Sequence, residues 1–152
     1  MKLIRATAAE CAAMAAAHAE AFADKAWRDD EFEDLLEGEG IFGFLAEDSR
    51  PAGVILCRVA GGEVEVLTVG VTPAARRRGV AQALIRAALA SAREAQASEA
   101  FLEVAVDNEG AIALYEALGF RRAGLRKSYY DRGAAGFTDA LVMRLDLNGA
   151  SA

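Results

Sequence analysis

The chain has 152 residues and a formal net charge of −6, so we expect one domain with a sizeable core and exclude a general nucleic-acid binder, which needs a positive surface. Hydrophobic residues make up 54% and charged residues 26%, as in ordinary soluble globular proteins. The two cysteines lie far apart and are accompanied by a single histidine, so the sequence favours neither a disulfide framework nor a metal site.

The alanine-rich N-terminal stretch predicts no signal peptide, because Glu10, His18 and Glu20 interrupt it. No apolar run approaches the roughly 20 residues that a membrane-spanning helix requires. We therefore expect a cytoplasmic protein with no membrane partner. The expected domain covers residues 1–147, and residues 148–152 are expected to form a flexible tail.

The first half of the chain predicts two helices followed by three strands. A short strand over residues 3–5 precedes a helix to about residue 23, for which Thr7 and Glu10 have capping-box spacing. A second helix is expected over residues 30–37. Three strands with short connections should then pair as an antiparallel meander. They are expected over residues 41–46, 52–59 and 63–71.

The second half predicts a crossover and a closing hairpin. A helix with an apolar stripe over residues 80–97 should place the strand over 100–106 parallel to the fourth strand. A further helix, capped by Asp107 and Asn108, should end at Gly119. Strands over residues 121–127 and 138–146 complete the sheet. The fold class is thus α/β in the broad sense (α+β), with a mixed, mostly antiparallel seven-stranded sheet and about four helices.

Residues 69–84 combine an apolar strand, a proline, three arginines, a glycine and a helix start without an acidic residue. Free backbone N–H groups and the positive end of a helix dipole therefore meet at one place, which favours binding of a phosphate. The alternative is that the arginines simply form a solvated turn. The stretch lacks the nucleoside-triphosphate and dinucleotide fingerprints.

Three other features carry weaker interpretations. His18 lies on an apolar helical stripe and is expected to be packed rather than catalytic. Gly70, inside a strand, marks either a bulge or the close approach of a backbone or ligand. The acidic segment over residues 24–39 is expected to be a solvated face, with attraction of a basic substrate as the alternative.

Two motifs together carry a family resemblance: Arg76-x-x-Gly79-x-Ala81, and Asn108-x-x-Ala111-x-x-Leu114-Tyr115-x-x-x-Gly119-Phe120. The chain resembles the GNAT superfamily of acetyl-CoA-dependent N-acetyltransferases. A narrower likeness, to the ribosomal-protein-alanine N-acetyltransferase (RimI) branch, rests on L-T-V at 67–69, F-L-E-V at 101–104 and the tyrosine pair at 129–130. Ala81 departs from the glycine that many members carry, which a backbone contact tolerates.

The resemblance implies a GNAT fold whose parallel fourth and fifth strands splay apart, and acetyl-CoA as co-substrate without a metal. The pantetheine arm would pair with the fourth strand by strand addition. Backbone amides of the arginine loop would hold the pyrophosphate, with the arginine side chains supplying long-range attraction. The expected coenzyme contacts are Leu67, Thr68, Val69, Arg76, Arg77, Arg78, Gly79, Val80, Ala81, Asn108 and Tyr115.

Catalysis by the family requires a base for the amine proton and an acid for the departing thiolate. The resemblance makes Glu103 the expected base, whereas the pattern alone slightly favours a glutamate at a sheet edge or strand end. Glu65 is the second candidate, as base or as contact for the substrate amine. Tyr115 is the expected acid, although a tyrosine on an apolar stripe is often only core. Cys57 lacks an activating histidine, so direct transfer is preferred to a covalent intermediate.

The resemblance further implies transfer to the N-terminal α-amino group of a protein, with the N-terminal alanine of a small-subunit ribosomal protein as the first acceptor. The alternatives are a GNAT enzyme for a small-molecule amine and a non-catalytic acyl-CoA-binding module. Tyr129 and Tyr130 are expected to line a peptide groove. We expect no nucleic-acid partner, and a monomer or weak dimer.

Overall fold

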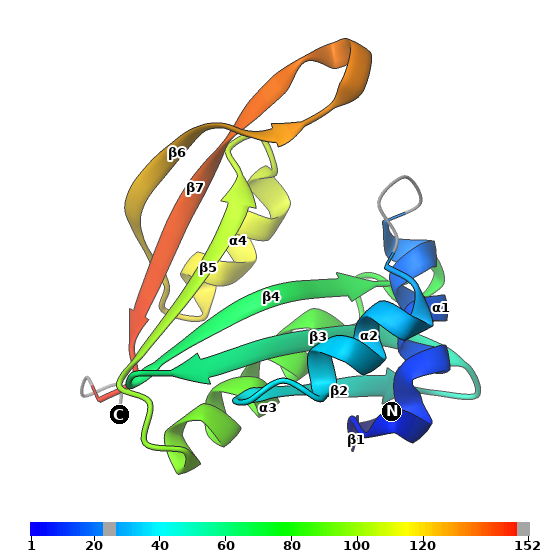
Figure 1. The fold of residues 1–152 in the computed structure, drawn as a ribbon. Helices are drawn as coiled ribbons and strands as arrows, with labels where there is room; N and C mark the ends of the chain where they lie inside the picture. The colour runs from blue at the N-terminus through cyan, green and yellow to red at the C-terminus, as the bar shows by residue number, and fades with distance from the viewer. Residues whose placement is uncertain (23–26, 149–152) are drawn as a thin grey trace.

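The computed structural model describes residues 1–22 and 27–148, and in these a seven-stranded sheet has the order β1-β2-β3-β4-β5-β7-β6. Helices α1 and α2 cover one face, and α3 and α4 lie on the other (Figure 1). The strands are β1 Lys2–Arg5, β2 Ile41–Glu47, β3 Pro51–Ala60, β4 Glu63–Val71, β5 Glu99–Ala105, β6 Arg121–Asp131 and β7 Phe137–Asp146. The helices are α1 Cys11–Ala21, α2 Asp29–Leu36, α3 Val80–Glu94 and α4 Glu109–Ala117. The predicted fold class is confirmed.

The start of α1 follows the predicted capping box. Thr7 accepts a hydrogen bond from the backbone, and the Glu10 carboxylate accepts one from the Thr7 N–H at 2.6 Å. This box closes a short 3-10 turn over Ala8–Glu10, and the α-helix begins only at Cys11. The predicted end at residue 23 lies outside the described residues, while the helix itself ends at Ala21.

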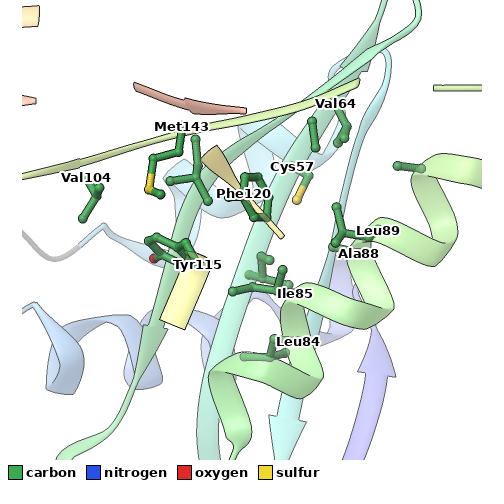
Figure 2. Close-up of a cluster of buried hydrophobic side chains, with 14 of the residues drawn as sticks. Cys57, Val64, Leu84, Ile85, Ala88, Leu89, Val104, Tyr115, Phe120 and Met143 are labelled. Carbon is green, nitrogen blue, oxygen red and sulfur yellow. The ribbon is translucent and has the colours of Figure 1, made fainter. Parts of the chain in front are cut away.

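Two hydrophobic clusters lie on opposite faces of the sheet. The larger one joins α3 and α4 to β3, β5 and β7 and includes Leu84, Ile85, Phe120 and Met143 (Figure 2). The smaller one packs α1 and α2 on β2 and β3 around Phe32. The β3 side chains from 52 to 57 are all buried, because helices cover both faces of this strand.

Strands β4 and β5 pair in parallel over only three residues each. Glu63, Val64 and Glu65 face Glu99, Ala100 and Phe101, and beyond this point the two strands separate (Figure 1). Leu67 has no partner in the register between β3 and β4, so β4 carries a bulge there. The bulge and the separation together leave the C-terminal part of β4, after Glu65, with a free edge toward β5.

Gly70 is where another element approaches β4, as its place in the strand predicts. A side-chain carbon at this position would lie 2.5 Å from the Phe22 ring and 2.9 Å from the Ala21 side chain. The close neighbour is thus the end of α1, and the bulge lies at Leu67 instead. Of the two predicted reasons for Gly70, close approach of another element is thus the one found, and that element is α1.

The closing hairpin is longer than predicted, since β6 extends to Asp131 and includes Tyr129 and Tyr130. Its pairing with β7 is interrupted between Arg126 and Tyr130. Ser128 has a φ of 53° there, and its N–H donates to the Asp139 carboxylate at 2.7 Å. The predicted strand ended at residue 127, before this irregular part, and so left both tyrosines in the connecting loop.

The remaining predicted boundaries differ little from the structure. Helix α3 ends at Glu94 rather than at residue 97, and α2 is one residue earlier than expected. Residues 149–152, most of the expected tail, lie outside the described residues, so the domain limits stay a prediction. In the described part of the chain, no helix is long and apolar enough to cross a membrane.

Candidate active site

The loop before α3 presents a group of backbone amides. Arg77 and Gly79 both have left-handed φ angles, 65° and 75°. The amides from Arg77 to Ala81 donate to no backbone carbonyl among the described residues, and the first turn of α3 holds no acidic side chain. Such a concave set of N–H groups at a helix N-terminus suits an anion. This geometry favours the anion site over the solvated turn.

The three arginine side chains of this loop are exposed and differ in their contacts. The Arg76 Nε atom donates to the Val71 carbonyl at 3.2 Å, which ties the loop to the end of β4. Arg77 and Arg78 form no ion pair with any described residue. Arg76 therefore shapes the loop, while the other two add positive charge around it.

The stretch from Leu67 to Val69 lies on β4 just past its last pair with β5. Its three side chains are half-buried, and its β5-facing edge is unpaired within the described residues. An extended ligand with amide groups can add to such an edge. The predicted pantetheine contacts thus lie where a ligand can enter the sheet.

Asn108 and Tyr115 belong to α4, on the other side of the splay. The Asn108 side-chain oxygen accepts from the Ala111 N–H at 3.2 Å, so this residue is the predicted N-cap. Tyr115 is 8% exposed and packs edge-on against Phe120, and its hydroxyl points away from that ring (Figure 2). Burial raises the pKa of Tyr115 to about 12, so its hydroxyl is protonated at neutral pH.

Glu103 lies on β5 past the last pair with β4, with its side chain only 18% exposed. Its carboxylate pairs with the Arg126 guanidinium at 3.2 Å, and this guanidinium lies 5.0 Å from the centre of the Tyr129 ring. Burial, and after it the Glu103 charge, raises the pKa of both Tyr129 and Tyr130. The two tyrosine hydroxyls that follow the interrupted pairing of β6 therefore lie near Glu103.

Glu65 faces the same cavity as Glu103. The cavity has a volume of about 330 Å³ and lies at the base of the splay, on the sheet face that carries α1 and α2. Glu65 pairs with Arg58 at 3.5 Å across β3 and β4. The cavity is lined by Arg58, Ala60, Glu63, Glu65, Phe101, Glu103, Arg126 and Val142. The structure therefore brings both candidate bases together, each with its own arginine.

Arg58 and Arg126 are the site residues that sequence reasoning missed. Arg58 interrupts an otherwise apolar strand, which is the same signal that singled out Glu103 on β5. Arg126 carries no such signal, because it is one of several charged residues along β6. Only the register of the strands reveals that these cations face the two glutamates.

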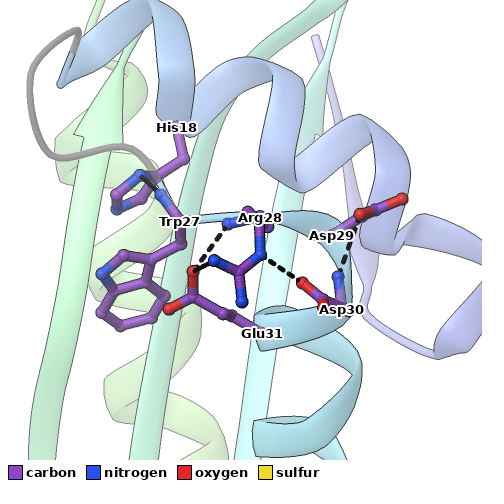
Figure 3. A network of polar contacts seen from close by, with 6 residues as sticks. All are labelled: His18, Trp27, Arg28, Asp29, Asp30 and Glu31. Atoms are coloured by element: carbon purple, nitrogen blue, oxygen red, sulfur yellow. Dashed lines mark hydrogen bonds and ion pairs between the residues drawn. The ribbon is translucent and has the colours of Figure 1, made fainter.

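The described part of the acidic segment forms the start of α2 and stabilises it. Arg28, next to the helix start, pairs with Asp30 at 2.9 Å and with Glu31 at 3.6 Å (Figure 3). Asp29, Asp30 and Glu31 occupy the first turn, where negative charge stabilises a helix. These contacts favour the solvated face over substrate attraction, and Asp24 lies outside the described residues.

No group of three metal-binding side chains occurs in residues 1–22 and 27–148.

Comparison with known proteins gives a consistent result. Residues 7–120 match the family model described as acetyltransferase (GNAT) family. The [ribosomal protein bS18]-alanine N-acetyltransferase of Salmonella typhimurium is 34% identical over 68% of this chain and 70% of its own length. The N-alpha-acetyltransferase RimI of Mycobacterium tuberculosis is 45% identical over 55% of this chain, and the chain spans about half of that relative, 49%.

A solved structure extends the similarity to nearly the whole chain. The ribosomal-protein-S18-alanine N-acetyltransferase of Escherichia coli superposes with a TM-score of 0.86 at 26% identity. The superposition covers 96% of this chain and 93% of that one.

Proposed function

The chain belongs to the acetyltransferase (GNAT) family, and from this premise we propose that it transfers acetyl from acetyl-CoA to the N-terminal α-amino group of a protein. The N-terminal alanine of a small-subunit ribosomal protein is the acceptor favoured by the names of its relatives. The observation that carries the proposal is Glu103, a mostly buried carboxylate in a cavity opposite the free edge of β4.

The chain's own backbone supports a coenzyme site in two parts. The free amides from Arg77 to Ala81 would hold the pyrophosphate, where no acidic side chain opposes it. The edge from Leu67 to Val69 would pair with the pantetheine amides. Asn108 has its side-chain NH₂ group left for the coenzyme after capping α4. Acetyl-CoA is the donor used by the family.

Proton transfer would use groups on both sides of the splay. As the amine nitrogen attacks the thioester carbonyl, Glu103 accepts the amine proton directly or through water, and the C–S bond breaks. Tyr115, protonated at neutral pH, donates to the departing thiolate. Glu65 would contact the acceptor amine or share its proton, because it lines the same cavity.

The acidity of the acceptor suits a base of ordinary strength. An α-amino group has a pKa near 8 and a lysine side chain one near 10.4, so about a tenth of the former is neutral at pH 7, against well under a thousandth of the latter. Glu103, which pairs with Arg126, would need only to collect a proton that the amine readily loses.

A panel of acceptors tests the proposal. The protein is incubated with acetyl-CoA and a peptide that begins with alanine, beside the same peptide with a blocked N-terminus and a lysine, and beside several small amines. Release of thiol only with the free N-terminus is the expected result. Equal release with the blocked peptide would contradict it, turnover of a small amine alone would favour the small-molecule alternative, and tight coenzyme binding without turnover would favour a binding module.

A further inference from the structure

His18 connects α1 to β4 and to Trp27, which precedes α2. It lies on α1, is 2% exposed and is surrounded by the rings of Phe22, Trp27 and Phe32 at centroid distances of 4.6, 5.0 and 5.6 Å. Its Nδ1 atom accepts the backbone N–H of Trp27 at 3.1 Å (Figure 3). Its Nε2 atom lies 3.1 Å from the Thr68 hydroxyl on β4.

The two contacts define the protonation state of the ring. Because Nδ1 accepts a hydrogen bond, it carries no proton, so the neutral ring has its proton on Nε2 and donates to Thr68. A doubly protonated imidazolium has no acceptor left, and the Trp27 N–H would then lose its partner inside a buried cluster. Only the neutral ring therefore links Trp27 to Thr68.

One end of this link lies on the free edge of β4. Thr68 follows the bulge residue Leu67 in the stretch proposed to pair with the pantetheine arm. Trp27 and Leu67 both pack against the cluster between α1, α2 and the sheet, on the face that carries the glutamate cavity. The indole ring is stacked on the imidazole with 25° between the ring planes.

We propose that His18 is a positioning residue, which in its neutral form ties Trp27 to Thr68 and so fixes the stretch of β4 from Leu67 to Val69. The inference deepens the proposed function and rests on it only for the coenzyme that pairs with this stretch. His18 itself touches neither reacting group and acts through Trp27 and Thr68.

The charges around His18 determine where the link titrates. Burial lowers the pKa of His18 below its ordinary value, and the Glu31 carboxylate on α2 opposes this in part. Arg28 pairs with Glu31 at 3.6 Å and weakens that opposition. Thr68 on β4 and the surrounding rings carry no charge. The lowered pKa favours the neutral ring, and protonation of the ring should release Trp27.

The single tryptophan makes this titration directly visible without any acceptor. Tryptophan fluorescence of the wild type is followed against pH, with His18→Gln as the matched control. We expect one transition with a midpoint below about 6.5, the ordinary histidine value, and its loss in the variant. A flat wild-type curve, or the same transition in His18→Gln, would overturn the proposal. This result does not depend on which amine is acetylated.

Steady-state kinetics then separate positioning from general support of the fold. His18→Gln keeps a donor at the Nε2 position and loses the Trp27 contact, whereas His18→Asn keeps an acceptor at the Nδ1 position and loses the Thr68 contact. Thr68→Val preserves the side-chain shape and removes the hydroxyl. Each is expected to raise the KM for acetyl-CoA about fivefold, the size of one neutral hydrogen bond, while kcat changes little.

The double variant of His18→Gln and Thr68→Val supplies the last test. If the link acts as one unit, the KM of the double variant for acetyl-CoA should match that of the single variants, because either break already frees Thr68 and its stretch of β4. Fully additive effects, an unchanged KM for acetyl-CoA, or a loss of kcat as large as the rise in KM would each overturn the proposal. Thermal unfolding of every variant is measured alongside, and Thr68→Val, at a half-buried position, keeps the test valid where a His18 variant fails to fold.

Discussion

The two halves of the sheet are built differently. Strands β1 to β4 with α1, α2 and α3, here called the platform, have helices on both faces, and β3 is buried through most of its length. Strands β5, β7 and β6 with α4, here called the arm, have a helix on one face only (Figure 1). Every β6 side chain except that of Tyr130 is exposed.

This difference separates two tasks. The proposed coenzyme contacts from Leu67 to Val69 and from Arg77 to Ala81 belong mainly to the well-packed platform, which suits binding in a fixed geometry. The proposed acid and base, Tyr115 and Glu103, belong to the arm, with Arg126 and the two phenols of β6 around them. The cleft exists because the two halves pair over only three residues of each strand.

The largest expected effect comes from removing the proton-transfer groups of the arm. Glu103→Gln and Tyr115→Phe should each lower kcat roughly a hundredfold, as loss of a general base or acid does, while acetyl-CoA binding to the platform stays close to wild type. Stopped-flow or steady-state thiol release measures kcat, and calorimetry measures coenzyme binding. A wild-type rate in Glu103→Gln would give the role to Glu65 or to water, which Glu65→Gln then distinguishes.

A pair of leucine substitutions compares the packing of the two halves. Leu84→Ala, in the platform core, should lower the free energy of unfolding by about 2–5 kcal/mol, because Leu84 is fully buried. Leu125→Ala, on β6, should change it by less than about 0.5 kcal/mol, because Leu125 is 51% exposed. Urea unfolding gives both values. Equal losses would show that the arm is packed as firmly as the platform.

A pair of glycine substitutions gives a smaller contrast. Gly70→Ala, in the platform, should cost about 1–2 kcal/mol, since its new methyl group meets Phe22 and Ala21 of α1. The methyl group added by Gly110→Ala, in the first turn of α4, would have no neighbour within 4 Å. This substitution should raise the free energy of unfolding slightly, by up to about 0.5 kcal/mol. Thermal unfolding compares them. A stabilising Gly70→Ala would mean that α1 moves away from β4 at little cost.

The smallest effect is expected for the ion pair that ties the hairpin tip to the start of α4. The Arg132 guanidinium contacts both Asp107 oxygens, at 2.7 and 2.8 Å, and this hydrogen bonding lowers the pKa of Asp107. A carboxyl group whose pKa is lowered in the folded state stabilises the fold at pH values above the ordinary carboxyl range. This stabilisation is lost as the pH falls through the folded-state pKa. Asp107→Asn should thus lower the unfolding midpoint slightly at pH 7, and the difference should shrink as the pH falls below the ordinary carboxyl range. A difference that persists in acid would indicate a role beyond charge.

Local features of the sequence predicted much of the fold. The capping box of Thr7 and Glu10, the Asn108 cap and the short turns of the meander depend on contacts within a few residues, so they can be recognised in the chain itself. The crossover through α3 required β5 to run parallel to β4, and it does. Glu103 stood out as one charge in an apolar strand, and the family resemblance gave it the role of base.

The rest depended on residues far apart in the chain. Glu65 and Glu103 share a cavity, and Arg58 and Arg126 pair with them, because of a strand register that no local pattern specifies. The partner of Gly70 proved to be α1, which no property of the glycine itself predicts. Tyr129 and Tyr130 reach the site through an irregular strand held by a contact between Ser128 and Asp139.

The sequence by itself therefore determined the elements, their order and the family motifs, because caps, turns and hydrophobic periodicity act over one or two turns of chain. Only the tertiary structure decided which charges meet and where His18 directs its two nitrogens. A shift of one residue in pairing turns every side chain of a strand to the other face, so the content of the cleft depends on register and on the bulge at Leu67. The register and the bulge are set by packing across the whole sheet.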